Sequence, residues 1–404
     1  MNVLVSILKY PPDFTGAGLR TAHMYRNLQF KGEVDRIFVI TTGACSERRD
    51  PCGISRQEIT TVGRYRNEKP QQTPAEILKK SLFVLRAAIL TIIQYLRVFK
   101  KVDLVHSIDS SWLSTIVGWC CFFTRKPLVK EIVLLGADDP VSIVRNKKHP
   151  ARFLFLFPFR AARLVVVLSN GLKKSCLSLG IPGSKIWYRL NPVYIDPAEQ
   201  RWDEGLAAAR LVSGKPWILH VGRISRRKNI GFLLRSAAYL EAEATLIFVG
   251  PWDDAGYHRE MMRSAERLHR DSGGMIDAVF LGRITDRKAL TYLFAHSKVF
   301  WFASRSEGMP NAVLESLICG TPVVSLALDG AMAEVIEPGR NGEIVDNTDP
   351  ALFGAAVQRW LHKGDIDRTD VSRRARQRFD PGLIEQEYLR RFRSVLSGVN
   401  TARC

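Results

Sequence analysis

The sequence lacks a long apolar run, and this absence argues against a protein with a membrane-spanning helix. A membrane-spanning helix needs about 20 consecutive apolar residues, and the longest candidate, 82–99, is interrupted by Arg86, Gln94 and Arg97. Residues 1–14 carry neither a basic n-region nor a cleavage site, so they do not have the pattern of a signal peptide. We therefore expect a cytoplasmic protein that begins with a β-strand.

A cysteine pattern typical of a metal site or a disulfide framework is also lacking. The seven cysteines are odd in number and scattered, with no CxxC pair among them. They are Cys45, Cys52, Cys120, Cys121, Cys176, Cys319 and Cys404. We expect free thiols in a reducing compartment and no bound metal.

Acidic residues are scarce in the first half of the chain. The net charge is +19, and residues 1–200 account for most of it, with 30 Lys and Arg against 15 Asp and Glu. Residues 201–404 hold 29 against 25. A basic half attracts an anionic membrane, a nucleic acid or a phosphorylated acceptor, and charge alone does not choose among them.

The length and the order of the expected elements predict two α/β domains. A chain of 404 residues exceeds one ordinary core, and short apolar runs alternate with helical stretches along it, which favours parallel sheets. We predict a Rossmann-like domain over 1–197, a second over 198–380, and a helix in 381–404 that crosses back to the first. The expected strands are 3–8, 36–41, 104–106, 128–133, 164–168, 217–221, 245–249, 279–281, 299–302 and 322–325.

Two glutamates, Glu307 and Glu315, stand on either side of a predicted helix start. Pro310 suits the first turn of a helix, so Glu307 is expected in the preceding loop and Glu315 inside the helix. The N–H groups at such a helix start suit sugar hydroxyls or an anion. The spacing alone leaves an alternative, an N-cap acid followed by a solvated acid.

A second motif, residues 220–229, joins a strand end to a basic loop. Gly222 ends the predicted strand, and Arg223 and Lys228 follow it before a helix. Arginine binds a diphosphate in bidentate fashion, lysine acts as a point charge, and the helix dipole adds to both. The alternative is a solvated basic loop.

The glutamate motif and the CGTPVVSLALDGAMAEVIEPGRNGEIVD that follows it resemble the E-x7-E region of the family-4 retaining glycosyltransferases. That family has the GT-B fold, in which two Rossmann-like domains face a central cleft. The resemblance implies that Glu307 lies beside the donor sugar and Glu315 holds the ribose hydroxyls of the nucleotide. It also implies that Gly308, Met309 and Asn311 offer backbone N–H groups to the sugar.

The basic loop is similar to the strand–GR–x4–K pattern of the same family. The resemblance implies that Arg223 and Lys228 neutralise the leaving diphosphate, and stabilisation of a developing charge is often the largest contribution to catalysis. Arg226 and Arg227 receive no role from it.

Two more segments match the family and add candidate donor contacts. Residues 279–284 match the strand end that cradles the base, which indicates Arg283, although an ordinary strand-to-loop transition is the alternative. Residues 11–18 match the glycine-rich loop after the first strand, where Gly16 and Gly18 would let backbone approach the phosphates or the acceptor. This loop is not a GxGxxG fingerprint, which argues against a nicotinamide enzyme.

The chain departs from the family in the loop after the strand predicted in 127–135. Many relatives carry a histidine there that touches the donor sugar, whereas this chain has Asp138 and Asp139. We expect one of them to take its place and assign Asp139 as the catalytic candidate. The alternative is a turn or N-cap acid before Pro140. The resemblance implies no metal, because GT-B enzymes generally use basic residues in that role.

The helical stretch 77–101 is apolar with a basic stripe. Lys79, Arg86, Arg97 and Lys100 fall close to one face at 3.6 residues per turn. Two interpretations stay open: a core helix with one solvated stripe, or a helix on a membrane surface. Because the first domain usually binds the acceptor in this family, the second interpretation points to a lipid-linked or envelope acceptor.

These observations predict an enzyme that moves a hexose-type sugar from a nucleoside-diphosphate sugar to a hydroxyl with retention. The setting would be envelope polysaccharide or glycolipid assembly, in the cytoplasm or on the cytoplasmic face of the membrane, with no cofactor. Two rivals remain: a GT-B nucleotide-sugar epimerase or phosphorylase, and a non-enzymatic basic binder of membrane or nucleic acid. No recognised nucleic-acid motif is present, so no nucleic-acid partner is expected.

Overall fold

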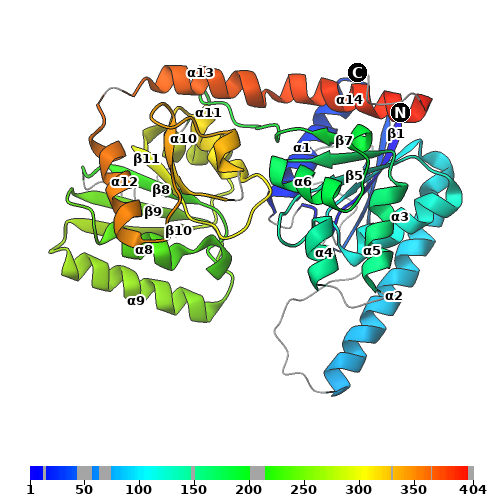
Figure 1. Cartoon of the computed structure of the whole chain (residues 1–404), viewed down its shortest axis with the longest axis horizontal. Coiled ribbons are helices and arrows are strands. Elements are labelled where there is room, and N and C mark those ends of the chain that lie inside the picture. Colours follow the sequence, from blue (N-terminus) through cyan, green and yellow to red (C-terminus); the bar gives the residue numbers. More distant parts are fainter. Residues whose placement is uncertain are drawn as a thin grey trace. The chain divides into compact units, whose positions relative to one another are not determined.

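A computed structural model describes residues 1–11, 15–42, 57–62, 74–146, 151–200, 214–328, 331–364 and 366–398. Three predictions reach outside this range: those for Cys45, Cys52 and Cys404, for part of the loop 11–18, and for the start of the second domain, of which residues 201–213 are not described. The chain forms two compact units, each with its own sheet (Figure 1). The first contains residues 1–192 and 381–404, and the second contains residues 193–380.

The first unit has a seven-stranded parallel sheet in the order β3-β2-β1-β4-β5-β6-β7. Its strands β1, β2, β4, β5 and β6 are almost entirely buried, as expected for a parallel sheet covered on both faces. The elements are β1 (Asn2–Ser6), α1 (Gly16–Phe30), β2 (Arg36–Thr41), β3 (Gln57–Thr61), α2 (Pro74–Val98), β4 (Leu104–Ile108), α3 (Trp112–Thr124), β5 (Leu128–Ile132), α4 (Pro140–Asn146), α5 (Ala151–Ala161), β6 (Leu164–Val167), α6 (Asn170–Ser178), β7 (Ile186–Tyr188) and α14 (Pro381–Ser397).

The second unit has a six-stranded parallel sheet in the order β10-β9-β8-β11-β12-β13. The elements are β8 (Trp217–Val221), α8 (Ile230–Ala237), β9 (Ala244–Val249), α9 (Ala255–Asp271), β10 (Ile276–Gly282), α10 (Arg287–His296), β11 (Val299–Phe302), α11 (Asn311–Ile318), β12 (Val323–Leu326), β13 (Gly342–Val345), α12 (Pro350–His362) and α13 (Arg368–Phe379). The predicted fold class, two Rossmann-like α/β parts, is confirmed.

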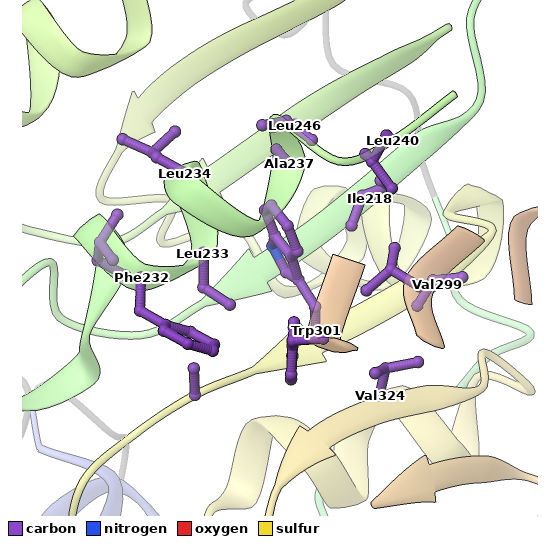
Figure 2. Close-up of a cluster of buried hydrophobic side chains, with 14 of the residues drawn as sticks. Ile218, Phe232, Leu233, Leu234, Ala237, Leu240, Leu246, Val299, Trp301 and Val324 are labelled. Carbon is purple, nitrogen blue, oxygen red and sulfur yellow. The ribbon is translucent and has the colours of Figure 1, made fainter. Parts of the chain in front are cut away.

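The core of the second unit lies between its sheet and the helices α8, α9 and α12. Trp301 of β11 is fully buried in it, among Ile218 from β8, Leu233 and Ala237 from α8, and Val324 from β12 (Figure 2). The short apolar runs seen in the sequence are therefore strands buried on both faces, which holds the carboxyl ends of β8 and β11 in fixed positions.

The C-terminal helix α14 belongs to the first unit. The Glu385 carboxylate accepts hydrogen bonds from Asn27 Nδ2 of α1 at 2.9 Å and from Nζ of Lys31, the C-cap of that helix, at 2.8 Å. The Tyr388 hydroxyl donates to Glu131 Oε2 on β5 at 3.0 Å. The chain thus enters the second unit after Pro192, five residues before the predicted boundary at 197, and leaves it at Asp380.

Strands β3, β7 and β13 were missed by the sequence analysis. Each is an edge strand of three to five residues. An edge strand is less completely covered than a central one, so it lacks the continuous apolar run by which the central strands were found.

Candidate functional site

Within the second unit, the candidate site lies at the carboxyl ends of β8 and β11. These strands are neighbours, but the chain continues from β8 toward β9 and β10 on one side, and from β11 toward β12 and β13 on the other. Such a reversal of strand order leaves room between the diverging loops, and ligands of open α/β sheets bind there.

Two glycines, Gly222 after β8 and Gly250 after β9, let the ends of these neighbouring strands approach each other closely. A Cβ atom on Gly250, whose φ is 145°, would lie 1.8 Å from the Gly222 carbonyl oxygen. Gly222 itself has a φ of 155°. A side chain at Gly250 would therefore push the loops after β8 and β9 apart, and only glycine fits.

The basic loop after β8 folds into a short 3-10 helix, Arg226–Lys228. The Ser225 hydroxyl caps it by accepting from the Lys228 N–H at 3.4 Å, and Asn229 takes a left-handed conformation, with a φ of 60°, before α8 begins at Ile230. The Lys228 side chain is nearly buried, with its Nζ 4.9 Å from the centre of the Phe302 ring at the end of β11.

Glu307, in the loop after β11, meets this basic loop directly. Its Oε1 lies 2.7 Å from Lys228 Nζ and accepts a hydrogen bond from the Ser304 hydroxyl at 2.8 Å. The same oxygen also pairs with Arg227 Nη1. The Glu307 side chain is 11% exposed and that of Arg227 is 42% exposed, so the cluster opens to solvent on the arginine side.

Burial and charge act in opposite directions on this cluster. Burial raises the pKa of the Glu307 carboxyl, but Lys228 and Arg227 outweigh it, so the pKa is lowered and the group is a carboxylate at neutral pH. Burial lowers the pKa of Lys228, and the Glu307 charge opposes that shift. Burial, with a contribution from Lys228, also lowers the pKa of nearby His220 to about 3, which leaves its ring neutral.

Helix α11 begins at Asn311, one residue after the predicted first-turn position of Pro310. Pro310 is the N-cap and offers no capping side chain. The loop that contains Glu307 leads directly into the positive N-terminal end of α11. Glu315 lies inside the helix, as the spacing predicted, and its Oε1 pairs with Arg287 Nη2 of α10 at 2.9 Å. Gly308 and Met309 are buried in the loop.

The other two arginines predicted in this unit lie nearer its surface. Arg223 follows Gly222 and pairs with Asp253 at 3.7 Å, a contact of two substantially exposed side chains. Arg283 is exposed and follows Gly282 at the end of β10. The strand-order reversal thus brings together Lys228 and Glu307, while Arg223 pairs with Asp253 and Glu315 pairs with Arg287.

The predicted glycines of the first unit lie at the start of α1. The Thr15 hydroxyl accepts from the Gly18 N–H at 3.1 Å, and Gly16 is the first residue of the helix. A Cβ atom on Gly18 would lie 2.6 Å from the Lys9 carbonyl oxygen. Gly18 therefore allows the loop after β1 to pack against the helix start.

Asp139 is occupied by contacts within its own unit. Its carboxylate accepts from the Gly136 N–H at 2.7 Å, the Ser142 N–H at 3.1 Å and the Ser175 hydroxyl at 2.5 Å. These are the contacts of an N-cap acid before Pro140, the alternative that the sequence left open. Its catalytic role stays a prediction.

Asp138 has a different environment from its neighbour. Burial, together with the Asp109 charge, raises the pKa of Asp138 to about 7. Burial likewise lowers the pKa of Lys130, which hydrogen-bonds to the Asp109 carbonyl, to about 8. The two acids thus shift in opposite directions, because hydrogen bonds from Ser142 and Ser175 outweigh burial and lower the pKa of Asp139.

Sequence reasoning missed three residues of the site: Arg227, Ser304 and Arg287. Arg227 also donates to the Ser306 carbonyl at 2.6 Å, and its own carbonyl accepts from the Arg305 N–H at 2.9 Å. It therefore ties the loops after β8 and β11 together. The only signal in the sequence was its place beside Lys228.

The described residues contain no group of three or more His, Cys, Asp and Glu side chains that could hold a metal ion. Within the same residues, no helix combines the length and the apolar character needed to cross a membrane. The four described cysteines, Cys120, Cys121, Cys176 and Cys319, are free.

Comparison with known sequences finds a family model that matches the part of the chain holding the candidate site. The family described as "Glycosyl transferases group 1" matches residues 205–378, which span both loops. A D-inositol 3-phosphate glycosyltransferase 2 from Catenulispora acidiphila is 26% identical over 85% of this chain and 81% of its own length. Sulfoquinovosyl transferase SQD2 from Arabidopsis thaliana is 30% identical over 48% of this chain and 36% of its own length.

A comparison with solved structures agrees on the fold. Anabaena Alr3699/HepE, solved with UDP and glucose, aligns over 98% of this chain and 100% of its own with a TM-score of 0.73 and 20% identity. The chain thus has the GT-B fold. Other curated relatives are matched over 34% to 45% of their own lengths. The family match and the fold together support a GT-B glycosyltransferase.

Proposed function

We propose that the protein is a family-4 retaining glycosyltransferase that moves a hexose-type sugar from a nucleoside-diphosphate sugar to a hydroxyl. One observation carries the proposal: Lys228 and Glu307 meet, 2.7 Å apart, where the strand order of the second unit reverses. A site for a sugar diphosphate needs a cation and a hydrogen-bond acceptor at such a point.

The leaving diphosphate accounts for the basic loop. Arg223 and Lys228 would neutralise the negative charge that grows as the glycosidic bond to the diphosphate breaks. Lys228 is well suited because it is buried, so its charge is weakly screened. The positive end of α11 would add to the same field.

Glu307 positions the donor sugar in this proposal. Its carboxylate is ionised and accepts hydrogen bonds, so it suits sugar hydroxyls that replace part of its contact with Arg227 and Lys228. Backbone N–H groups of Gly308, Met309 and Asn311 would contact the same sugar, and Glu315 the ribose. We assign Glu307 no nucleophilic role, and the configuration is retained by attack on the face that the diphosphate leaves.

Similar proteins support the donor class. HepE has been solved with UDP-glucose as well as with UDP and glucose, and D-rhamnosyltransferase WbpZ of Pseudomonas aeruginosa is 26% identical over 46% of this chain. We further propose a lipid-linked or saccharide acceptor of the cell envelope, action in the cytoplasm or on the cytoplasmic face of the membrane, and no metal.

Release of free nucleoside diphosphate from a panel of UDP-, GDP- and ADP-sugars tests the proposal. The release is measured with and without a lipid extract from the source cells. Release from one donor that rises with the extract supports a transferase with a lipid acceptor. Phosphate-dependent release of a sugar phosphate, or a change of the donor sugar without an acceptor, would favour the phosphorylase or epimerase instead.

A further inference from the structure

Helix α2 of the first unit leaves one face without a partner among the described residues. Its inward residues, Ala87, Thr91, Tyr95 and Val98, are buried, and the helix packs against α3 on that side. The Tyr95 hydroxyl is 2.6 Å from the Thr124 hydroxyl at the end of α3. The large aliphatic side chains on the rest of the helix are exposed: Leu82, Val84, Leu85, Ile89, Ile92, Ile93 and Leu96.

These aliphatic residues form a helical stripe rather than a scatter. Leu82, Leu85, Ile89, Ile92 and Leu96 follow one another at steps of three and four, so they lie along one line of the helix. Isolated exposed apolar residues are common on protein surfaces, whereas a contiguous stripe marks an interaction surface. In Figure 1, α2 (cyan) runs beside α3 and extends past it.

The apolar surface continues across α3 and α5, which pack against each other. Phe122 is 52% exposed and Phe123 is 74% exposed, both on α3, and on α5 about half of Phe153 is exposed. Behind them, the rings of Trp119 and Phe157 stack with centroids 3.8 Å apart. Exposed aromatic rings are thus carried on a fixed support.

A proline in α5, Pro158, helps to hold the Trp119 ring in place. Pro158 has no N–H to donate to the Leu154 carbonyl four residues before it, and the Trp119 indole N–H donates to that oxygen instead, at 3.0 Å. Gly118 makes room for the proline, because a Cβ atom there would lie 2.6 Å from Pro158 Cβ. The contact joins α3 to α5 and orients Trp119.

The charge around this surface has one sign. Residues 82–101, 112–126 and 152–163 contain nine Lys and Arg and no Asp or Glu. Seven of these cations are exposed: Arg86, Arg97, Lys100, Lys101, Arg125, Arg160 and Arg163. A second copy of the chain would bring an equally cationic face, and like charges brought together oppose association.

We propose that α2, α3 and α5 form a docking face for an anionic lipid bilayer, with α2 lying in the plane of the membrane surface. Aliphatic and aromatic side chains would enter the boundary between headgroups and acyl chains, and the flanking cations would contact acidic headgroups. Each of these cations adds to the attraction of the protein to such a surface. Vesicle binding needs no sugar donor, so this inference and the proposed transferase can fail separately.

Flotation with phosphatidylcholine vesicles, with and without phosphatidylglycerol, tests the docking face on the full-length protein. We expect binding to the anionic vesicles, weaker binding at high salt, and little binding to phosphatidylcholine alone. The Lys100→Glu/Lys101→Glu variant should bind the anionic vesicles at least about tenfold more weakly. The Leu85→Gln/Ile89→Gln variant, which removes apolar surface without changing charge, should also bind more weakly.

A matched control carries the same charge change on the second unit. Arg259→Glu/Arg263→Glu alters two exposed arginines of α9 and should leave vesicle binding near wild type. Equal losses for both charge variants would overturn the proposal, because binding would then depend on net charge alone. A dimer in sedimentation that Leu85→Gln/Ile89→Gln dissociates, with no vesicle binding by the wild type, would also overturn it.

Discussion

Glu131 in the first unit and Glu307 in the second are both carboxylates held by cations, yet their surroundings differ. Glu131 pairs with Arg20 and, at 3.1 Å, with His106 Nε2, and all three side chains are at most 3% exposed. Glu307 pairs with Lys228 and with the 42%-exposed Arg227. The first network is closed, whereas the second opens to solvent.

The two networks also differ in what they join. Glu131 accepts from Tyr388 on α14, and His106 contacts the Tyr25 hydroxyl at 2.8 Å, so the closed network fastens helices to the first sheet. Glu307 joins two loops at a reversal of strand order. The pKa of the carboxyl group is lowered in both Glu131 and Glu307. The candidate site is therefore distinguished by its position at the strand-order reversal and by its access to solvent, rather than by a shifted pKa.

Substitution of Glu131 should therefore damage stability. Glu131→Gln leaves the buried Arg20 without a countercharge, and we expect a loss of about 3–5 kcal/mol in the free energy of unfolding, measured in urea. Glu33→Gln removes the exposed partner of Arg393, a residue of α14, and should cost less than about 1 kcal/mol. Equal losses would remove the distinction between closed and exposed pairs.

Substitution of Lys228 should damage turnover more than stability. Lys228→Met removes the buried cation at the leaving diphosphate, and we expect nucleoside diphosphate release to fall by about 10²–10³. Arg226→Met changes a 65%-exposed neighbour and should have little effect. A Lys228→Met enzyme with near-normal turnover would place the diphosphate elsewhere.

Acid should weaken the closed network. Burial raises the pKa of Glu131, but Arg20 and His106 outweigh it and lower the pKa to about 2. The stabilisation is present above the ordinary glutamate pKa of about 4.5 and is lost as pH falls toward 2, by about 3 kcal/mol in total. Urea unfolding from pH 6 down to about pH 3 measures the first part of this loss. Glu131→Gln should lose part of this pH dependence, and an unchanged slope would contradict the assignment.

The smallest effect is expected from a single hydroxyl. Tyr388→Phe removes one hydrogen bond to the Glu131 carboxylate and should cost about 1.5 kcal/mol in the free energy of unfolding, without changing turnover. Tyr239→Phe, at a tyrosine that is 54% exposed, is the matched control and should be nearly neutral. A change in turnover on Tyr388→Phe would mean that the closed network reaches the reaction.

The sequence predicted the open site better than the closed network. Lys228 and Glu307 lie in short motifs that follow strands, so local spacing together with the family resemblance selected them as candidates. The partners of Glu131 come from three distant segments, and no local pattern relates Arg20, His106 and Tyr388. Arg227 was missed for a similar reason: its contact with Glu307 depends on β8 and β11 being neighbours in the sheet.

The most direct test of the account compares Glu307→Ala with wild type in nucleoside diphosphate release from the preferred donor. Nucleotide binding by calorimetry and urea unfolding are measured beside it, with Glu260→Ala, an exposed glutamate, as the control. We predict a loss of at least about 10²-fold in release, retained nucleotide binding and a folded protein that loses less stability than Glu131→Gln. Unchanged release by folded Glu307→Ala would contradict the assignment of the sugar site to the loop after β11.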